Sequence, residues 1–438
     1  MKSRLLILSL FMSMVFAGFQ SKAQNLLSLK EAVKIGLEEN LDIEIADIRE
    51  AQAQINTGKG AAGMLPSVTA QGDISYNVSN TRQQFLDGRA NAIPLGTAFR
   101  ANVGARMDWT VFDGMAMYVR RDLLDDELEL ASIEVKEQAQ TLGANISVTY
   151  QDLVLQAELI EILEENAAYL EDLVELSEAK LEIGSISKLE VLQAQTDLNE
   201  VEGARQLAMM NYELSVAELN NSLNREASNY FTVDTSFLIP ANPPDYDVWV
   251  EKALRSNFGI KRSRKSLQMA QRNIELAEAQ MKPRVNLNAG FDIGYLNSTF
   301  GFLVSNRSVG PFVGASVSYN IFDGYRVNRE IELAKLQTQI SELSIDRLSL
   351  GLKNNLFIFY QRFQYHAKQV EIEEGNLELA DENFRLGEAL FRNGGISQFD
   401  LRQIRIQKLA IERRLISARY QMAVAYIRML ELSGEPWL

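Results

Sequence analysis

Few side chains in this sequence are of the types that carry covalent or metal chemistry. The 438 residues contain no cysteine and a single histidine, His366, which falls in a helical stretch. Metal sites and cysteine or histidine nucleophiles are therefore nearly excluded, and we predict no metal and no cofactor. Carboxylates are plentiful, but they occupy helical surface positions without a histidine or a glycine-rich loop nearby. A carboxylate-based hydrolase is an alternative that these surroundings do not favour.

Charge and composition restrict the class of protein further. The net charge of −14 argues against nucleic acid as a partner. A hydrophobic content of 46% indicates a folded protein, and only 8 prolines favour long helices. Residues 1–23 have the features of a secretory signal peptide, with Lys2 and Arg4 before an apolar stretch and small residues at 21–23. A membrane anchor is the alternative, but polar residues interrupt the stretch before the ~20 apolar residues that a span needs.

Three pairs of segments recur at an offset of 210 or 217 residues. They are Trp109–Gly114 with Tyr319–Gly324, Gly184–Ser187 with Gly394–Ser397, and Met64–Val68 with Met281–Val285. Two diverged copies of one unit, over 24–228 and 248–438, explain these repeats. The proline-rich segment 229–247 between them is predicted as a linker.

Each copy contains a region where the hydrophobic period changes from 3.6 to 2. Apolar and polar residues alternate over 67–78 and 99–111, and again over 284–295 and 312–321. The pattern predicts two β-hairpins, at 66–112 and 283–322, whose strands are joined by loops 79–98 and 297–310. Each strand would have one apolar and one polar face, which is typical of membrane β-barrels. A soluble sandwich with packed apolar faces is the alternative.

Four strands are too few for a closed barrel, since about eight is the practical minimum. Open sheet edges cannot lie in lipid, so several copies of the chain would have to combine their strands. Trp109 and Tyr319, near the ends of their strands on the apolar side, are predicted to lie at the membrane interface.

Long helices must connect the strand ends to the glycine-containing turns. Asp113 and Asp323 follow the hairpins and are predicted to cap the next helix. The stretches 112–184 and 322–394 contain no proline, and the first repeats apolar residues at steps of three and four. Each would form a helix about 100 Å long at 1.5 Å per residue. A shorter amphipathic helix is predicted over 29–53.

The order, duplication and spacing of these motifs resemble the outer-membrane efflux protein family, the TolC-like outer-membrane factors, over residues 25–433. The carrying motifs are Leu29–Val33, Leu37–Asn40, Met64–Val68, the Phe-Asp-Gly strand ends and Leu181–Gln195. The resemblance implies a mainly α protein with a transmembrane β-barrel part. Three copies would give a 12-stranded barrel, continued by a hollow α-barrel through the periplasm.

The same resemblance implies a function, a location and partners. The protein would be the outer-membrane exit duct of a tripartite efflux pump or type I secretion system, and would catalyse no reaction. A periplasmic adaptor protein would link it to an inner-membrane RND or ABC transporter. A structural coiled-coil protein of the envelope without channel activity is the alternative, although it would not need lipid-compatible strands.

The resemblance also assigns candidate site residues. A pore constriction at the periplasmic end would involve Asp400, Gln403 and the equivalent first-copy residue Glu190. Simple helix capping by Asp400 and Glu190 is the alternative. The turns are predicted to dock the adaptor through Gly184, Ser185, Ile186, Ser187, Gly394, Gly395, Ile396 and Ser397. In this prediction Ile186 and Ile396 are exposed and provide the apolar contact.

Overall fold

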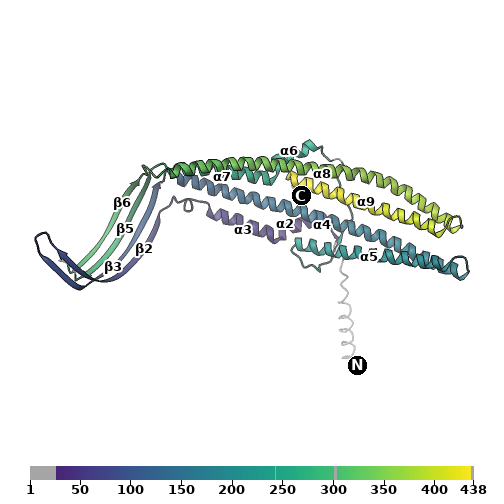
Figure 1. Cartoon of the computed structure of the whole chain (residues 1–438), viewed down its shortest axis with the longest axis horizontal. Coiled ribbons are helices and arrows are strands. Elements are labelled where there is room, and N and C mark those ends of the chain that lie inside the picture. Colours follow the sequence, from purple (N-terminus) through teal and green to yellow (C-terminus); the bar gives the residue numbers. More distant parts are fainter. Residues whose placement is uncertain (1–25, 242, 300–302, 436–438) are drawn as a thin grey trace, which may run out of the picture. The chain divides into compact units, whose positions relative to one another are not determined.

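The computed structural model describes residues 26–241, 243–299 and 303–435 (Figure 1). The predicted signal peptide at 1–23 lies outside the described residues. The chain divides into two compact units, which we describe separately. One unit is helical and contains the described residues of Met1–Ala46, Val135–Ile260 and Leu348–Leu438. The other contains a β-sheet with its adjoining helices and consists of Asp47–Glu134 and Lys261–Arg347.

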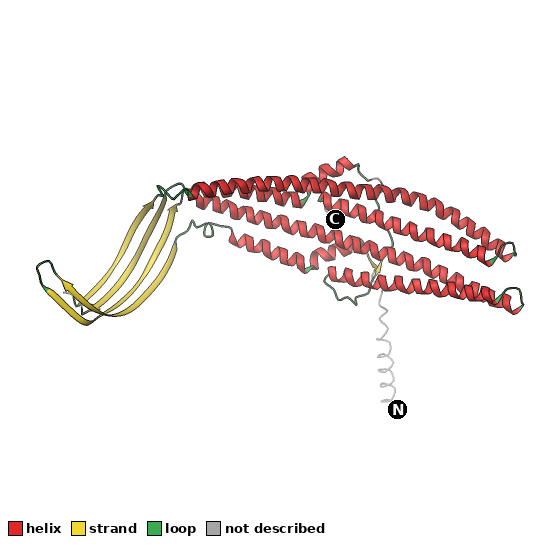
Figure 2. Ribbon diagram, viewed as in Figure 1, coloured by secondary structure: helices red, strands yellow, loops and turns green. Residues whose placement is uncertain are grey.

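The order of helices and strands repeats within the chain. Figure 2 distinguishes the helices from the strands. The first round is α2 (Leu29–Glu39), α3 (Leu41–Asn56), β2 (Ser67–Gln84), β3 (Ala90–Phe112), α4 (Ala116–Glu182) and α5 (Lys188–Ser222). The second is α6 (Tyr246–Ser256), α7 (Phe258–Ala279), β5 (Arg284–Ser298), β6 (Ser305–Ser318), α8 (Arg326–Arg392) and α9 (Gln398–Ser433). The long helices α4 and α8 have 67 residues each. The equal lengths keep the 210-residue offset constant from the strand ends to the turns.

The helical unit has two apolar cores that occupy equivalent positions in the two copies. One core includes Ile146 and Leu153 of α4, and Leu219 of α5 packs with them. The other includes Leu356 and Phe363 of α8, and Met429 of α9 packs with them. Each of these residues is 210 positions from its counterpart. A short parallel pair, β1 (Leu26–Leu27) with β4 (Thr232–Val233), borders the first core.

The predicted single helix over 29–53 is wrong, because Asn40 interrupts it. The Asn40 carboxamide accepts a hydrogen bond from the N–H of Asp42 at 2.9 Å and donates to the carbonyl of Ser222 at 2.9 Å. Asn257 interrupts the second copy in the same way, since it accepts from Ile260 at 3.1 Å and donates to the Leu432 carbonyl at 3.0 Å. A side chain that replaces backbone bonds at a helix start favours such a break.

In the sheet unit, four antiparallel strands follow the order β2-β3-β5-β6. The strands differ from the prediction at their ends. Strands β2 and β3 pair beyond Val78 into the predicted loop 79–98, with one irregularity between Ser79 and Thr81. The polar side chains there do not alternate with apolar ones, so the sequence pattern did not reveal them. In the second copy β6 ends at Ser318, three residues before the predicted end.

Register places the apolar side chains of neighbouring strands on one face of this sheet. Val103 lies opposite Ile293, which lies opposite Val309. These side chains, and others on the same face such as Ile74 and Val313, are exposed. A soluble sandwich would cover this face, so the structure contradicts that alternative. The opposite face carries polar side chains, for example Asp73, whose carboxylate accepts a hydrogen bond from Asn102.

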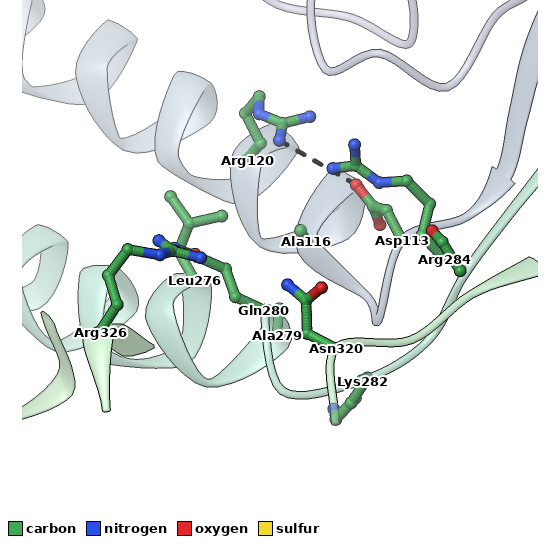
Figure 3. A pocket seen from close by; sticks show the side chains of 11 residues that line it. Asp113, Ala116, Arg120, Leu276, Ala279, Gln280, Lys282, Arg284, Asn320 and Arg326 are labelled. Carbon is green, nitrogen blue, oxygen red and sulfur yellow. Dashed lines mark hydrogen bonds and ion pairs between the residues drawn. The ribbon is translucent and has the colours of Figure 1, made fainter. Parts of the chain in front are cut away.

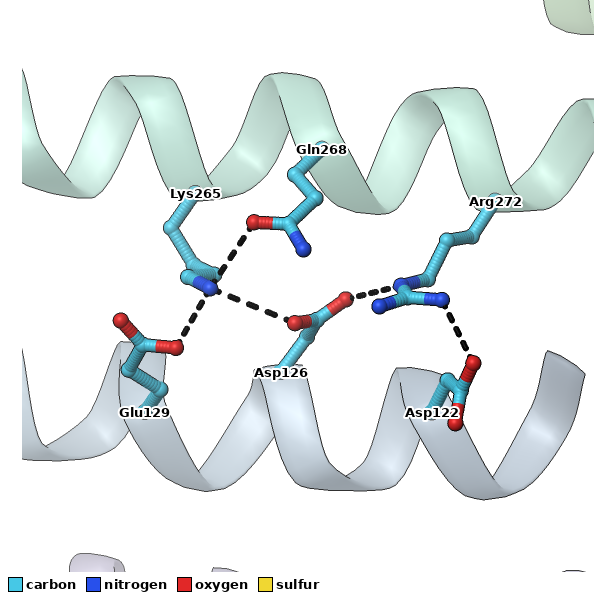
Figure 4. Close-up of polar contacts among 6 residues, drawn as sticks. All are labelled: Asp122, Asp126, Glu129, Lys265, Gln268 and Arg272. Atoms are coloured by element: carbon cyan, nitrogen blue, oxygen red, sulfur yellow. Dashed lines mark hydrogen bonds and ion pairs between the residues drawn. The ribbon is translucent and has the colours of Figure 1, made fainter.

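Ion pairs join α4 to α7, and the Lys265–Asp126 pair among them is buried (Figure 4). The ammonium of Lys265 contacts Asp126 at 3.3 Å and Glu129 at 2.5 Å. Arg272 contacts the other oxygen of Asp126 at 2.5 Å and Asp122 at 2.7 Å. Burial opposes the charge of Lys265, but the hydrogen bonds to the two acids raise its pKa above the ordinary value. This arrangement fixes α7, and with it the start of β5, against α4.

None of the described helices is both long and apolar enough to cross a membrane.

Candidate functional site

The two turns that end the long helices have the same backbone geometry. Gly184 and Gly394 adopt positive φ angles of 72° and 74°. The residue after each glycine closes the helix with a backbone hydrogen bond to the carbonyl five residues earlier. Ser185 donates to the carbonyl of Lys180 at 2.8 Å, and Gly395 donates to that of Leu390 at 2.8 Å. A left-handed residue followed by this bond is a common way to end a helix, and glycine adopts it without strain.

The helices that leave these turns begin with capping boxes. The Ser187 side chain accepts from the N–H of Glu190, and the Glu190 carboxylate accepts from the Ser187 N–H at 3.3 Å. Ser397 and Asp400 repeat the arrangement, with 3.1 Å from the Ser397 nitrogen to the carboxylate. Hydrogen bonds from the Ser397 side chain and backbone lower the pKa of Asp400. The candidate pore acids Glu190 and Asp400 therefore both cap helices.

The prediction that Ile186 and Ile396 are exposed is wrong, because both are half-buried. Each isoleucine directly precedes a capping serine, and an apolar residue there often packs against the fourth residue of the helix. In the second turn that residue is Leu401, and it and Ile396 both lie close to Gly387. The exposed apolar side chains of the turns are instead Ile183, Leu189 and Phe399, at 79%, 74% and 65% exposure.

Close to the turns, a buried charge cluster joins the first copy to the second. The Asp197 carboxylate contacts Arg402 at 2.7 Å and Arg405 at 3.2 Å. Arg405 also donates to the Asn166 side chain at 2.8 Å. Burial lowers the pKa of Arg405, and the Asp197 carboxylate acts in the opposite direction. The cluster links α5, α9 and α4.

Sequence reasoning missed this cluster. The i, i+3 spacing of Arg402 and Arg405 indicates one helix face, but nothing in the sequence identifies Asp197 on another helix as the partner. Gln403, the candidate pore residue between the two arginines, is exposed. A cavity of about 230 Å³ borders the cluster and reaches the exposed residues Leu189 and Phe399.

The two aromatic residues predicted at the strand ends differ in setting. Trp109 lies within β3, and its indole N–H donates to the carbonyl of Met64 at 2.9 Å. Tyr319 follows the last residue of β6 and is exposed, so its predicted place inside the strand is wrong. Alternation continues to Ile321, so the sequence pattern extends beyond the end of the strand; further on, Phe322 packs edge-on against Tyr325.

Asp113 and Asp323 lie between the strands and the long helices. The Asp113 carboxylate accepts from the backbone N–H of Met117 at 3.0 Å. Asp323 accepts from the N–H groups of Arg326 and Val327 at 3.2 and 3.1 Å. These bonds satisfy N–H groups that have no partner within the helix. Asp113 is buried, whereas Asp323 is partly exposed.

Among the described residues, no group of three or more His, Cys, Asp or Glu side chains is placed to hold a metal ion.

Comparison with known proteins identifies the family. Residues 33–225 and 249–435 match the family described as outer membrane efflux protein. The chain is 22% identical over 432 residues to a probable efflux pump outer membrane protein, TtgC, of Pseudomonas putida, covering 94% of this chain and 83% of that protein. It is 21% identical over 423 residues to nodulation protein T of Rhizobium leguminosarum, covering 92% and 81%.

Solved structures share the fold. The outer-membrane channel OprN superposes with a TM-score of 0.75 at 17% identity, covering 93% of this chain and 90% of that one. The outer membrane protein VceC of Vibrio cholerae gives 0.73 at 16% identity, covering 94% and 97%. The match to a family of transport channels extends over nearly the whole chain, including both copies of the duplication. The chain therefore belongs to the outer membrane efflux protein family.

Proposed function

We propose that this outer-membrane exit duct is assembled from three copies of the chain. The exposed apolar face of the sheet carries the proposal, because in a single chain that face has no cover. The outer strands β2 and β6 each have one unpaired edge within the described sheet, and unpaired edges cannot lie in lipid. Three copies supply twelve strands, the number that the resemblance implies, and their union closes both edges. The polar face then lines a water-filled passage.

Cysteine cross-linking tests the assembly, since the sequence contains no native cysteine. Ser67 starts β2 and Ser318 ends β6, so both lie at the helix end of the sheet. Within one chain they are separated by three strand spacings of about 4.8 Å, too far for a disulfide. Ser67→Cys with Ser318→Cys should therefore give oxidised dimers and trimers in denaturing gels, and either change alone should not. A stable monomer in detergent would contradict the trimer.

Conductance tests the passage itself. The purified trimer should form water-filled channels in a planar bilayer. A trimer that inserts and does not conduct would favour the structural coiled-coil alternative.

The turns are proposed to dock a periplasmic adaptor, which connects the duct to an RND or ABC transporter that supplies the energy. Leu189 and Phe399 support this, because they are exposed apolar side chains at equivalent positions of the two turns. Leu189→Asp with Phe399→Asp should preserve trimers and conductance, and abolish export and cross-linking to the adaptor. Lys188→Asp is the matched control, since it makes the same turn more negative at an exposed position and removes no apolar contact. Normal export by the double variant would reject the docking surface.

A ring of three Asp400 side chains is proposed to form the pore constriction, with Glu190 and Gln403 beside it. Asp400→Asn keeps an amide oxygen that can accept from Ser397 and removes the charge. The variant should therefore keep its fold and lose part of the channel's preference for cations over anions, measured as a shift in reversal potential. An unchanged reversal potential would leave Asp400 as a helix cap alone.

A further inference from the structure

A pocket of about 440 Å³ lies in the sheet unit where strands meet helices (Figure 3). The start of α4, the end of α7, the start of β5 and the start of α8 all contribute to it. Its charged lining residues are Asp113, Arg120, Lys282, Arg284 and Arg326. Gln280, Ser318 and Asn320 add uncharged polar groups. The lining therefore has four cations and one carboxylate, in a chain whose net charge is −14.

The cations of this basic pocket are only partly neutralised. Arg120 approaches Asp113 at 4.0 Å, and Arg326 is paired with Glu330 at 2.8 Å. Within the described part of the chain, Lys282 and Arg284 form no ion pair. Both side chains line the pocket and are exposed, so no carboxylate within the described residues neutralises either charge.

Two helix starts, each capped by an aspartate, border the basic pocket. Ala116 begins α4 and Arg326 begins α8, and both line it. A helix N-terminus carries a partial positive charge, so it disfavours neighbouring cations and favours a bound anion. The Asp113 and Asp323 carboxylates already accept hydrogen bonds from these two helix starts. A bound oxyanion would therefore contact the side-chain cations, and the amide and hydroxyl groups of the lining can donate hydrogen bonds to it.

The duplication shows that the fold does not require these cations. The segment Met281–Val285 repeats Met64–Val68, and Leu65 and Ser67 stand where the second copy has Lys282 and Arg284. Both segments connect a helix to a strand of the same sheet. The first copy makes this connection without charge. The need to connect a helix to a strand therefore does not explain why positions 282 and 284 carry positive charges.

We propose that the basic pocket binds a phosphate-type oxyanion. Arg284 lies opposite Ser318 in the register and hence on the polar face of the sheet. In the trimeric duct of the proposed function this face lines the passage, so the anion would come from solution, as the phosphorylated or otherwise polyanionic part of an exported solute. This assignment of the source rests on the proposed function, whereas the binding does not. A phospholipid headgroup has the same chemistry and is the other source.

Phosphate binding to the full-length protein in detergent tests the proposal. Inorganic phosphate is titrated at constant ionic strength against chloride and followed by calorimetry or ³¹P NMR. We expect saturable binding at one site per chain. Lys282→Leu with Arg284→Ser, which installs the residues of the first copy, should weaken it by about tenfold or more, since each cation lost removes a charge-assisted contact. The matched control is Arg100→Gln, on the same face of the sheet and twelve residues along β5 from Arg284 by register, roughly 40 Å. It should bind as the unmodified protein does.

Native mass spectrometry of the same preparations distinguishes the two sources. The unmodified protein could retain an anionic phospholipid that the double variant loses, while neither binds inorganic phosphate. That result would support an anion site in the basic pocket and identify its ligand as a lipid headgroup. Absence of saturable binding in both measurements, or equal binding by the double variant, would overturn the proposal. Conductance is recorded separately. A protein that binds phosphate but does not conduct would contradict only the proposed channel function. A protein that conducts but does not bind phosphate would contradict only the proposed anion site.

Discussion

The two copies of the duplication have the same helix breaks and turns, but they differ in the charged residues through which one copy contacts the other. Asn40 and Asn257 interrupt their helices in the same way, and both long helices end in the same turn. The acidic caps repeat as well, but the charge cluster near the turns does not. Asp197, which binds Arg402 and Arg405, has an uncharged glutamine as its second-copy counterpart, Gln407.

The comparison separates two kinds of residue. Positions that repeat support backbone geometry, such as breaks, turns and caps. Positions that differ form the charge cluster near the turns and the basic pocket at the strand ends, where a cation of one copy meets groups of the other. Divergence after duplication therefore marks residues whose role the shared backbone geometry does not explain.

The largest difference in stability loss between equivalent substitutions in the two copies is expected at the charge cluster. Asp197→Ala leaves the buried Arg405 without its carboxylate partner, and breaking a buried pair costs about 3–5 kcal/mol. The exposed second-copy counterpart Gln407 has no such role, so Gln407→Ala should change stability by less than about 0.5 kcal/mol. Denaturant unfolding of the detergent-solubilised protein measures both. Similar losses for the two variants would refute the asymmetry.

Part of the fold follows from periodicity and part does not. Apolar residues recur every three to four positions in the first long helix and every second position in the strands, so short windows of the sequence reveal both. The 210-residue offset reveals the duplication. The interruption at Asn40 is not visible in that way, because its stabilising acceptor is the carbonyl of Ser222, 182 residues away.

The same limit applies to the candidate site. The turns and caps are local, so Gly184, Ser187 and Asp400 could be selected from sequence. Ile396, by contrast, lies close to Gly387 of the preceding helix, a contact that the turn motif itself does not reveal. The partners of Asp197 lie in the other copy, and pairing over such separations leaves no periodic signal.

The strands offer a test in which the two copies should behave alike. Val103 of β3 and Val313 of β6 are equivalent, exposed and on the apolar face. If both face lipid near the bilayer centre, Val103→Arg and Val313→Arg should each destabilise the inserted trimer by about 2–4 kcal/mol. Trp109→Arg, at the interface, should cost less. Heat-induced dissociation of trimers on gels ranks the variants.

Gln71→Arg is the control for these strand variants, because Gln71 lies on the polar face and should tolerate the charge. If only one of the two Val→Arg variants destabilises the trimer, the two hairpins are not equivalent.

Equivalent tyrosines of the cores should respond differently. The Tyr150 hydroxyl donates to the Leu27 carbonyl at 2.8 Å and accepts from the Asp234 N–H at 2.9 Å. Tyr150→Phe leaves both groups unpaired and should cost about 1–3 kcal/mol in unfolding free energy. Tyr360, its counterpart, packs against the Tyr246 ring, and its hydroxyl forms no hydrogen bond within the described residues. Tyr360→Phe should therefore change stability by less than about 0.5 kcal/mol.

The pH dependence of stability gives a second readout of Tyr150. Burial raises its pKa from 10.0 to about 12, because the phenolate would lose hydration. A raised pKa in the folded state stabilises the protein fully below pH 10 and ceases to do so as the pH rises to about 12. Tyr150→Phe should remove this part of the alkaline loss of stability. If Tyr150→Phe loses stability at alkaline pH as the unmodified protein does, a group other than Tyr150 causes that loss.

The smallest expected effect concerns the capping boxes, and here the copies should again agree. Ser187→Ala and Ser397→Ala each remove one side-chain acceptor at a helix start, which typically costs ~1 kcal/mol. Because both turns are exposed, we expect local fraying of the first turn of α5 or α9, visible as faster hydrogen exchange, with trimers unchanged.

The acidic partner of the second box adds a dependence on pH. The pKa of Asp400 is lowered by its bonds from Ser397, so the carboxylate stabilises the turn above its ordinary value of 3.8 and ceases to do so as the pH falls through the lowered value. Protection of the α9 start should therefore be constant from neutral pH to about pH 5, once exchange is corrected for its intrinsic pH dependence. Ser397→Ala should move the loss of protection to higher pH, because the hydroxyl no longer stabilises the charged form. If the profile of Ser397→Ala matches that of the unmodified protein, the hydroxyl does not control Asp400, and the two boxes are alike only in geometry.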